Sequence, residues 1–198
     1  FLLKLTNKPM KRLSLYLFLL LFTLPTPSQA DDIRDFQIEG MSIGDSFLNY
    51  LSKSEIENNK VFEVEQKTNK EVARYYIREN TGDYNIITVS FKTDDKQYKI
   101  IELSGFIYAS YGECKKKRES IDKETRLLFK NLTRNATGDH KHYLDKSTKV
   151  NHIVYQFSNN GYISLTCYDW SKKSGYNDQL RLEIYSNEYL EWLKSLKS

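Results

Sequence analysis

Residues 150–170 read VNHIVYQFSNNGYISLTCYDW, and this stretch decides the fold. Apolar and polar residues alternate on both sides of a short segment that carries two asparagines and a glycine. Alternation with a period of two predicts two half-buried β-strands, 150–157 and 162–170, joined by a tight turn. A further alternating run at 179–185 predicts a third strand. We therefore expect the C-terminal part of the chain to form an antiparallel sheet.

The turn decides which residues of the first two strands face each other. A two-residue turn would place apolar side chains opposite polar ones. A three-residue loop at 159–161, with Gly161 in the left-handed conformation, instead pairs apolar residues, Phe157 with Ile163. We choose the second arrangement, which also directs Cys167 toward the core.

Cys114 and Cys167 are the two cysteines of the chain. Cys114 lies on the apolar face of the clearest helix, residues 111–132, where apolar residues recur every three or four positions. The helix should cross the sheet where both cysteines point inward, so we predict a disulfide between them. Two buried free thiols are the alternative. The basic run 115–118 is assigned to the exposed face of the helix.

The rest of the chain adds strands and short helices. Strands are predicted at 72–78, 85–91 and 97–108, with Gly105 as a candidate bulge. Two short helices are predicted between 42 and 59, the second beginning at a capping box of Ser52 and Glu55. A short helix is predicted at 187–196, and 135–149 is predicted to be a loop. The expected fold class is α+β, a mostly antiparallel sheet of about six strands packed by one long central helix, with two short N-terminal helices and a short C-terminal helix.

Residues 10–30, MKRLSLYLFLLLFTLPTPSQA, have the pattern of an export signal. Lys11 and Arg12 precede an apolar run too short to span a bilayer, and Ala30 ends a segment that signal peptidase accepts. Residues 1–9 are expected to be an upstream extension or an artefact. We expect 31–198 to be a single soluble domain, periplasmic or secreted, with no membrane span after cleavage.

The net charge of +4 arises before the predicted cleavage site. That segment holds four of the 30 basic residues and no acidic residue, so the rest of the chain is balanced against its 26 acidic residues. A balanced charge gives no broad attraction to nucleic acid or to anionic lipid, and no nucleic-acid partner is expected.

No catalytic or cofactor motif stands out, so we predict no catalytic residue, no cofactor and no metal. An alternative function is a small metal-assisted envelope hydrolase that uses His140, His142 and His152, because residues two apart on an extended segment share a face. Exposed loop histidines are the simpler interpretation. A further alternative is an envelope assembly or structural factor.

The second face of the C-terminal sheet carries aromatic rings between hydrogen-bonding groups. This mixture is typical of surfaces that bind a peptide, a glycan or a protein. We therefore predict a non-catalytic binding or envelope-interaction domain, whose partner is an envelope protein, a peptide or a glycan. The alternative is that the short N-terminal helices or the long loop cover this face. The predicted ligand-binding residues are Tyr162, Tyr168, Trp170, Arg181 and Tyr185.

Residues 36–46, FQIEGMSIGDS, and 167–170, CYDW, are distinctive together. With the export signal and Glu113-Cys114, they resemble an uncharacterised family of small exported proteins of marine alphaproteobacteria with reduced genomes. The resemblance covers nearly all of 31–198. It implies export and provides no catalytic residues to transfer.

Overall fold

The computed structural model describes residues 32–62, 71–79 and 81–196. The predicted export signal and the predicted extension at 1–9 lie outside the described residues.

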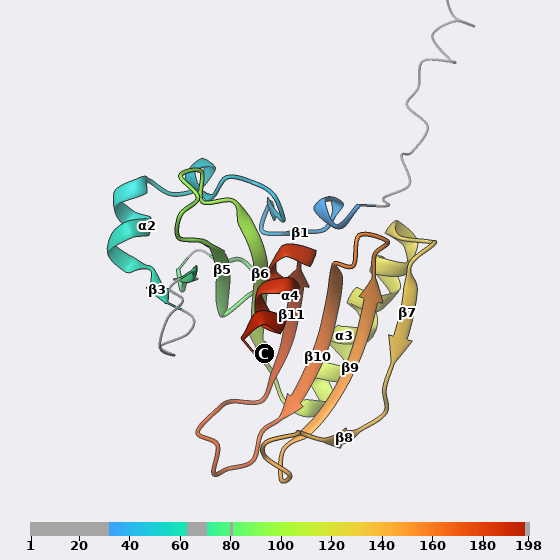
Figure 1. Ribbon diagram of the computed structural model, residues 1–198. Coiled ribbons are helices and arrows are strands. Elements are labelled where there is room, and N and C mark those ends of the chain that lie inside the picture. Colours follow the sequence, from blue (N-terminus) through green and yellow to red (C-terminus); the bar gives the residue numbers. More distant parts are fainter. Residues whose placement is uncertain (1–31, 63–70, 80, 197–198) are drawn as a thin grey trace, which may run out of the picture.

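One large antiparallel sheet organises the described residues (Figure 1). Its strands follow the order β3-β4-β5-β6-β11-β10-β9-β7, and β8 also pairs with β9. The strands are β3 (Val61–Phe62), β4 (Val72–Ile77), β5 (Ile86–Lys92), β6 (Ile100–Tyr108), β7 (Thr133–Ala136), β8 (His140–Lys141), β9 (Lys149–Gln156), β10 (Tyr162–Asp169) and β11 (Gln179–Tyr185). A separate hairpin pairs β1 (Gln37–Ile38) with β2 (Met41–Ser42), and the α-helices are α2 (Lys53–Asn59), α3 (Tyr111–Leu128) and α4 (Asn187–Ser195).

The predicted α+β class with a large antiparallel sheet is confirmed, but the count of six strands is wrong. The six predicted strands correspond to β4, β5, β6, β9, β10 and β11, and the structure adds the short strands β3, β7 and β8 to the sheet. All residues of β7 and β8 are exposed, and the two strands fall near or within the predicted loop. They lack an apolar alternation because backbone pairing to β9, rather than burial of a side-chain face, makes them strands.

Only one of the two predicted N-terminal helices is present. α2 begins at the predicted capping box, where the backbone N–H of Glu55 donates to Ser52 Oγ at 3.3 Å. The other prediction is reduced to a single 3₁₀ turn, Phe47–Asn49. Residues just before it pair in β2, and Gly44 has a φ of 92°, which no helix accommodates.

The two faces of the sheet are covered differently (Figure 1). On the inner face, α3 packs across β10 and β11, and Phe36, Ile38 and Phe47 of the N-terminal segment join the main core. On the outer face, Tyr189 and Trp192 of α4 form a second, smaller core with residues of β4 and β6. Among the described helices, α4 is the one that lies on the outer face of the sheet.

The predicted disulfide is confirmed. Cys114 of α3 and Cys167 of β10 are bonded, with Cα atoms 5.8 Å apart, and both residues are fully buried. The assignment of the whole basic run to the exposed face is wrong at Arg118, which is buried one turn after Cys114. One turn further, the buried carboxylate of Asp122 accepts hydrogen bonds from Arg134 of β7 and Tyr155 of β9.

The β9–β10 turn has the predicted length but a different register. Ile163 pairs with Tyr155, two residues from the predicted partner, and a shift by two leaves each side chain on the face that was predicted for it. The left-handed residue is Asn160, with φ 65°, and not Gly161. Gly161 is required for space, because a Cβ there would lie 3.0 Å from the backbone oxygen of Tyr185.

Gly105 does not form the predicted bulge. The register shift between β5 and β6 lies at Ser90 and Phe91. The ring of Tyr84 instead packs directly over Gly105, where a Cβ would overlap it. The absence of a side chain at Gly105 therefore leaves the space that the Tyr84 ring occupies.

Candidate functional site

A groove crosses the outer face of β9, β10 and β11 between α4 and residues 140–143. Its part beside β8 has a volume of about 480 Å³, and its part beside α4 about 540 Å³. Val154 and Tyr162 line both parts, so the two parts adjoin each other on this face of the sheet. The first part is lined by His140, Lys141, His142, Tyr143, Val150, His152, Val154, Tyr162, Ser164, Thr166, Tyr168 and Glu183, and the second adds Gln156, Asn160, Asn187, Leu190, Leu193 and Lys194.

A column of aromatic rings holds α4 against the sheet. Tyr162 and Tyr185 are directly opposite on β10 and β11, and their ring centroids are 4.8 Å apart. Tyr185 stacks on Tyr189 of α4 at 5.3 Å, and Tyr189 contacts Trp192 at 5.4 Å. The wall of the groove formed by α4 is thus fixed by ring packing that begins in the sheet.

A second column lies on the same face toward the other end of the strands. The guanidinium of Arg181 is 4.8 Å from the ring centroids of both Phe106 and Tyr168. Tyr168 also stacks on Trp170, with centroids 4.9 Å apart and an interplanar angle of 5°. A cation beside two aromatic rings is stabilised by their electron-rich faces, so Arg181 is held in place by its neighbours.

Glu183 lies on the groove floor between the two columns. It is only 9% exposed, and its Oε1 accepts a hydrogen bond from the Tyr185 hydroxyl at 2.8 Å and forms an ion pair with Arg181 at 3.5 Å. Within the part of the chain that the structure describes, its Oε2 has no hydrogen-bond partner. Burial raises the pKa of Glu183 above its ordinary value, against the opposing charge of Arg181. The groove therefore offers a ligand one carboxyl oxygen of a mostly buried side chain.

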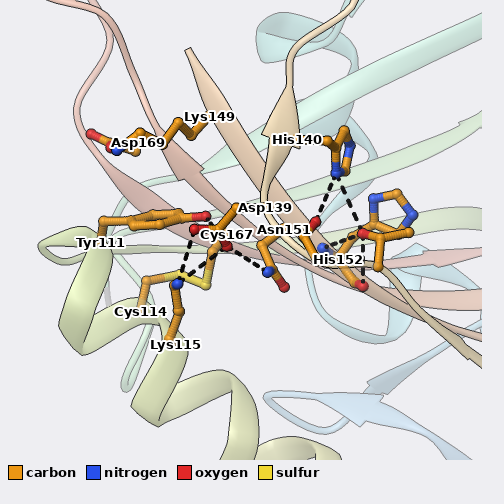
Figure 2. A network of polar contacts seen from close by, with 12 residues as sticks. Tyr111, Cys114, Lys115, Asp139, His140, Lys149, Asn151, His152, Cys167 and Asp169 are labelled. Carbon is orange, nitrogen blue, oxygen red and sulfur yellow. Dashed lines mark hydrogen bonds and ion pairs between the residues drawn. A yellow bond between two sulfur atoms is a disulfide. The ribbon is translucent and has the colours of Figure 1, made fainter.

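The wall formed by residues 140–143 is anchored at its start by Asp139 (Figure 2). The Asp139 carboxylate accepts hydrogen bonds from Asn151 at 2.7 Å, Tyr111 at 3.0 Å and Lys115 at 3.1 Å. These contacts, that with Asn151 first, lower the pKa of Asp139 to about 2. The carboxylate thus ties the start of this wall to α3 and β9.

Asp145 anchors the other end of the same wall. Its carboxylate accepts hydrogen bonds from the hydroxyls of Ser147, Thr148 and Ser171, at 2.5 to 2.6 Å. Hydrogen bonds to the ionised form, that from Ser147 first, lower its pKa well below the usual range. Ser171 belongs to the loop after β10, so the wall is joined to a distant segment and is preformed.

The three histidines of the alternative metal site lie along this wall and the floor. His140 and His152 meet edge to face, with ring centroids 5.1 Å apart, while His142 contacts Trp170 at 5.4 Å. Among the described residues, no three His, Cys, Asp or Glu side chains are grouped so that they could hold a metal ion. Burial lowers the pKa of His152, which favours a neutral ring in the groove.

The structure separates the five predicted ligand-binding residues into two groups. Tyr162 and Tyr168 line the groove. Trp170, Arg181 and Tyr185 are not part of the lining and instead pack against neighbouring aromatic rings. Sequence reasoning missed Glu183, although strand alternation places it on the same face as Arg181 and Tyr185. It also missed the contribution of α4, whereas the long loop considered as a cover for this face does line the groove, through residues 140–143.

Comparison with protein-family models, curated proteins and solved structures finds no match. None of the helices in the described residues has the length and apolar character needed to cross a membrane. The function is therefore argued from the groove itself.

Proposed function

We propose that this protein is an exported, non-catalytic binding domain that holds a segment of a partner polypeptide in the outer-face groove. The observation that carries the proposal is a groove of two adjoining parts with walls, α4 and residues 140–143, that are held by ring packing on Tyr185 and by hydrogen bonds to Asp139 and Asp145. A preformed site spares a ligand the entropic cost of ordering the protein.

The two ends of the groove differ in character, and this favours a peptide. Beside α4, the lining includes Leu190 and Leu193, which suit an apolar side chain. In the middle, Glu183 presents an acceptor to an N–H group. A polypeptide supplies both kinds of group at short spacing, and the proposal takes this class over a glycan.

Export is supported by the disulfide, since structural disulfides persist in oxidising compartments. The predicted signal at 10–30 gives the same destination, the periplasm or the exterior. Membership of the exported family that the sequence resembles belongs to the same proposal.

The variant V154W tests the groove. Val154 lines both parts of the groove, so an indole at this position would fill the junction between them. The matched control is Y76W, because Tyr76 is a partly exposed residue of β4, which lies toward the opposite edge of the same sheet from β9. Thermal unfolding first establishes that both variants fold.

Short random peptides displayed on phage are selected on the wild-type protein, and their affinities are measured by fluorescence anisotropy. We expect V154W to weaken binding about tenfold or more, and Y76W to bind as the wild type does. Selected peptides that bind V154W with unchanged affinity would exclude the groove. A glycan array that gives V154W-sensitive signals, with no peptide enriched, would overturn the choice of a polypeptide ligand.

A further inference from the structure

Two loops distant in sequence lie together at one end of the sheet (Figure 1). One joins β8 to β9, residues 142–148, and the other joins β10 to β11, residues 170–178. The Ser171 hydroxyl donates to Asp145 at 2.6 Å, and the Ser171 N–H donates to Thr148 Oγ1 at 3.0 Å. The two loops therefore form one ordered surface.

Large apolar side chains protrude from this surface. Tyr143, Leu144 and Tyr176 are 75%, 76% and 66% exposed. The ring centroid of Trp170 lies 4.9 Å from that of Tyr176 and 5.4 Å from that of His142. The His142 ring in turn contacts Tyr143, with centroids 4.8 Å apart, so ring contacts connect the two loops. Exposed apolar side chains that gather at loop tips mark an interaction surface. Tyr143, Leu144, Trp170 and Tyr176 are called the loop-tip patch below.

Positive charge surrounds the loop-tip patch. Lys141, Lys146, Lys172 and Lys173 are all exposed. The acidic residues of these two loops are Asp145 and Asp178, and both accept hydrogen bonds from within the loops. Within the loops, Lys146, Lys172 and Lys173 outnumber these two acids, and Asp169 beside them is paired with Lys149. Exposed ammonium groups therefore remain for an external anion.

We propose that the loop-tip patch docks on an anionic membrane surface. Tyrosine and tryptophan favour the headgroup region of a bilayer, where an apolar ring and a polar tip are both accommodated. Lysines near the surface add attraction to anionic lipid headgroups. The ordered loops present aromatic, aliphatic and cationic groups together, which is the composition of a peripheral membrane contact.

A lipid surface fits this geometry better than a protein partner. The apolar groups are few and sit at projecting loop ends (Figure 1). A stable protein interface requires about 800 Å² on each partner around a packed centre, whereas a bilayer accepts isolated side chains that enter between headgroups.

The test is co-sedimentation with vesicles of phosphatidylcholine, with and without phosphatidylglycerol. We expect binding to the anionic vesicles that falls as salt concentration rises. K172Q/K173Q should lower the partition coefficient about tenfold or more, since each lysine near an anionic surface contributes independently. Y143S/L144S should also lower it several-fold, by removing apolar side chains from the headgroup region.

The matched control is L127S/L128S, which removes two exposed leucines, 66% and 53% exposed, at the end of α3. This control should bind as the wild type does. V154W should do so as well, which separates membrane docking from the proposed peptide groove. Absence of binding to anionic vesicles would overturn the proposal, as would equal loss in the control and in Y143S/L144S.

Discussion

The disulfide provides the sharpest quantitative prediction. Cys114 and Cys167 are separated by 53 residues, and cross-linking a chain over that separation removes about 14 cal/mol/K of entropy from the unfolded state. At 25 °C this corresponds to about 4 kcal/mol of stability. The free energy of unfolding of a domain of this size is about 5–15 kcal/mol, so the disulfide contributes a large share of it.

The measurement is urea denaturation of the wild-type protein with and without reductant, followed by far-UV circular dichroism. Reduction should lower the free energy of unfolding by about 4 kcal/mol and raise the m-value, because the unlinked unfolded chain exposes more surface. The reduced wild type is a better comparison than an alanine variant, since it keeps both buried sulfur atoms and adds no cavity.

The control is C114A/C167A, whose unfolding should not respond to reductant. Both sulfurs are bonded to each other, so the unreduced protein should resist alkylation in the folded and the unfolded state. The reasoning is refuted if reduction changes the free energy of unfolding by less than about 1 kcal/mol. It also fails if both thiols are freely alkylated in the native, unreduced protein.

Three further predictions concern Asp122, Gly105 and Asp139. D122A should lower stability by about 1.5–3 kcal/mol in chemical denaturation, because it removes the buried carboxylate that accepts hydrogen bonds from Tyr155 and Arg134; a loss below about 0.5 kcal/mol would contradict this. G105A should cost about 1–3 kcal/mol by displacing the Tyr84 ring, and an unchanged melting temperature would argue against that packing. Asp139 has a depressed pKa of about 2, so the stability it contributes is present above its ordinary pKa of 3.8 and is lost as pH falls through about 2. D139N should therefore lose less stability on acidification than the wild type does. Equal losses of stability in the two proteins as the pH falls would contradict this.

The sequence predicted the elements that carry a periodic pattern. The alternation in 150–170 and 179–185 led to β9, β10 and β11 with the correct inner face, and the period of α3 placed Cys114 against Cys167. Alternation has a period of two, so it determines which face a side chain takes but not which partner it meets. The β9–β10 register was therefore wrong by two residues while every face was correct.

The tertiary structure alone decided what lies across the outer face. Tyr162 and Tyr168 could be assigned to that face from strand alternation, yet only the folded chain shows that α4 and residues 140–143 rise beside them and form a groove. It also shows that Arg181 and Tyr185 are packed among aromatic neighbours and that Trp170 belongs to the loop-tip patch. Periodicity is a local property of the sequence, and it shows which side of a helix or strand is buried. A groove depends on contacts between segments that are far apart in the chain, and no local pattern encodes those contacts.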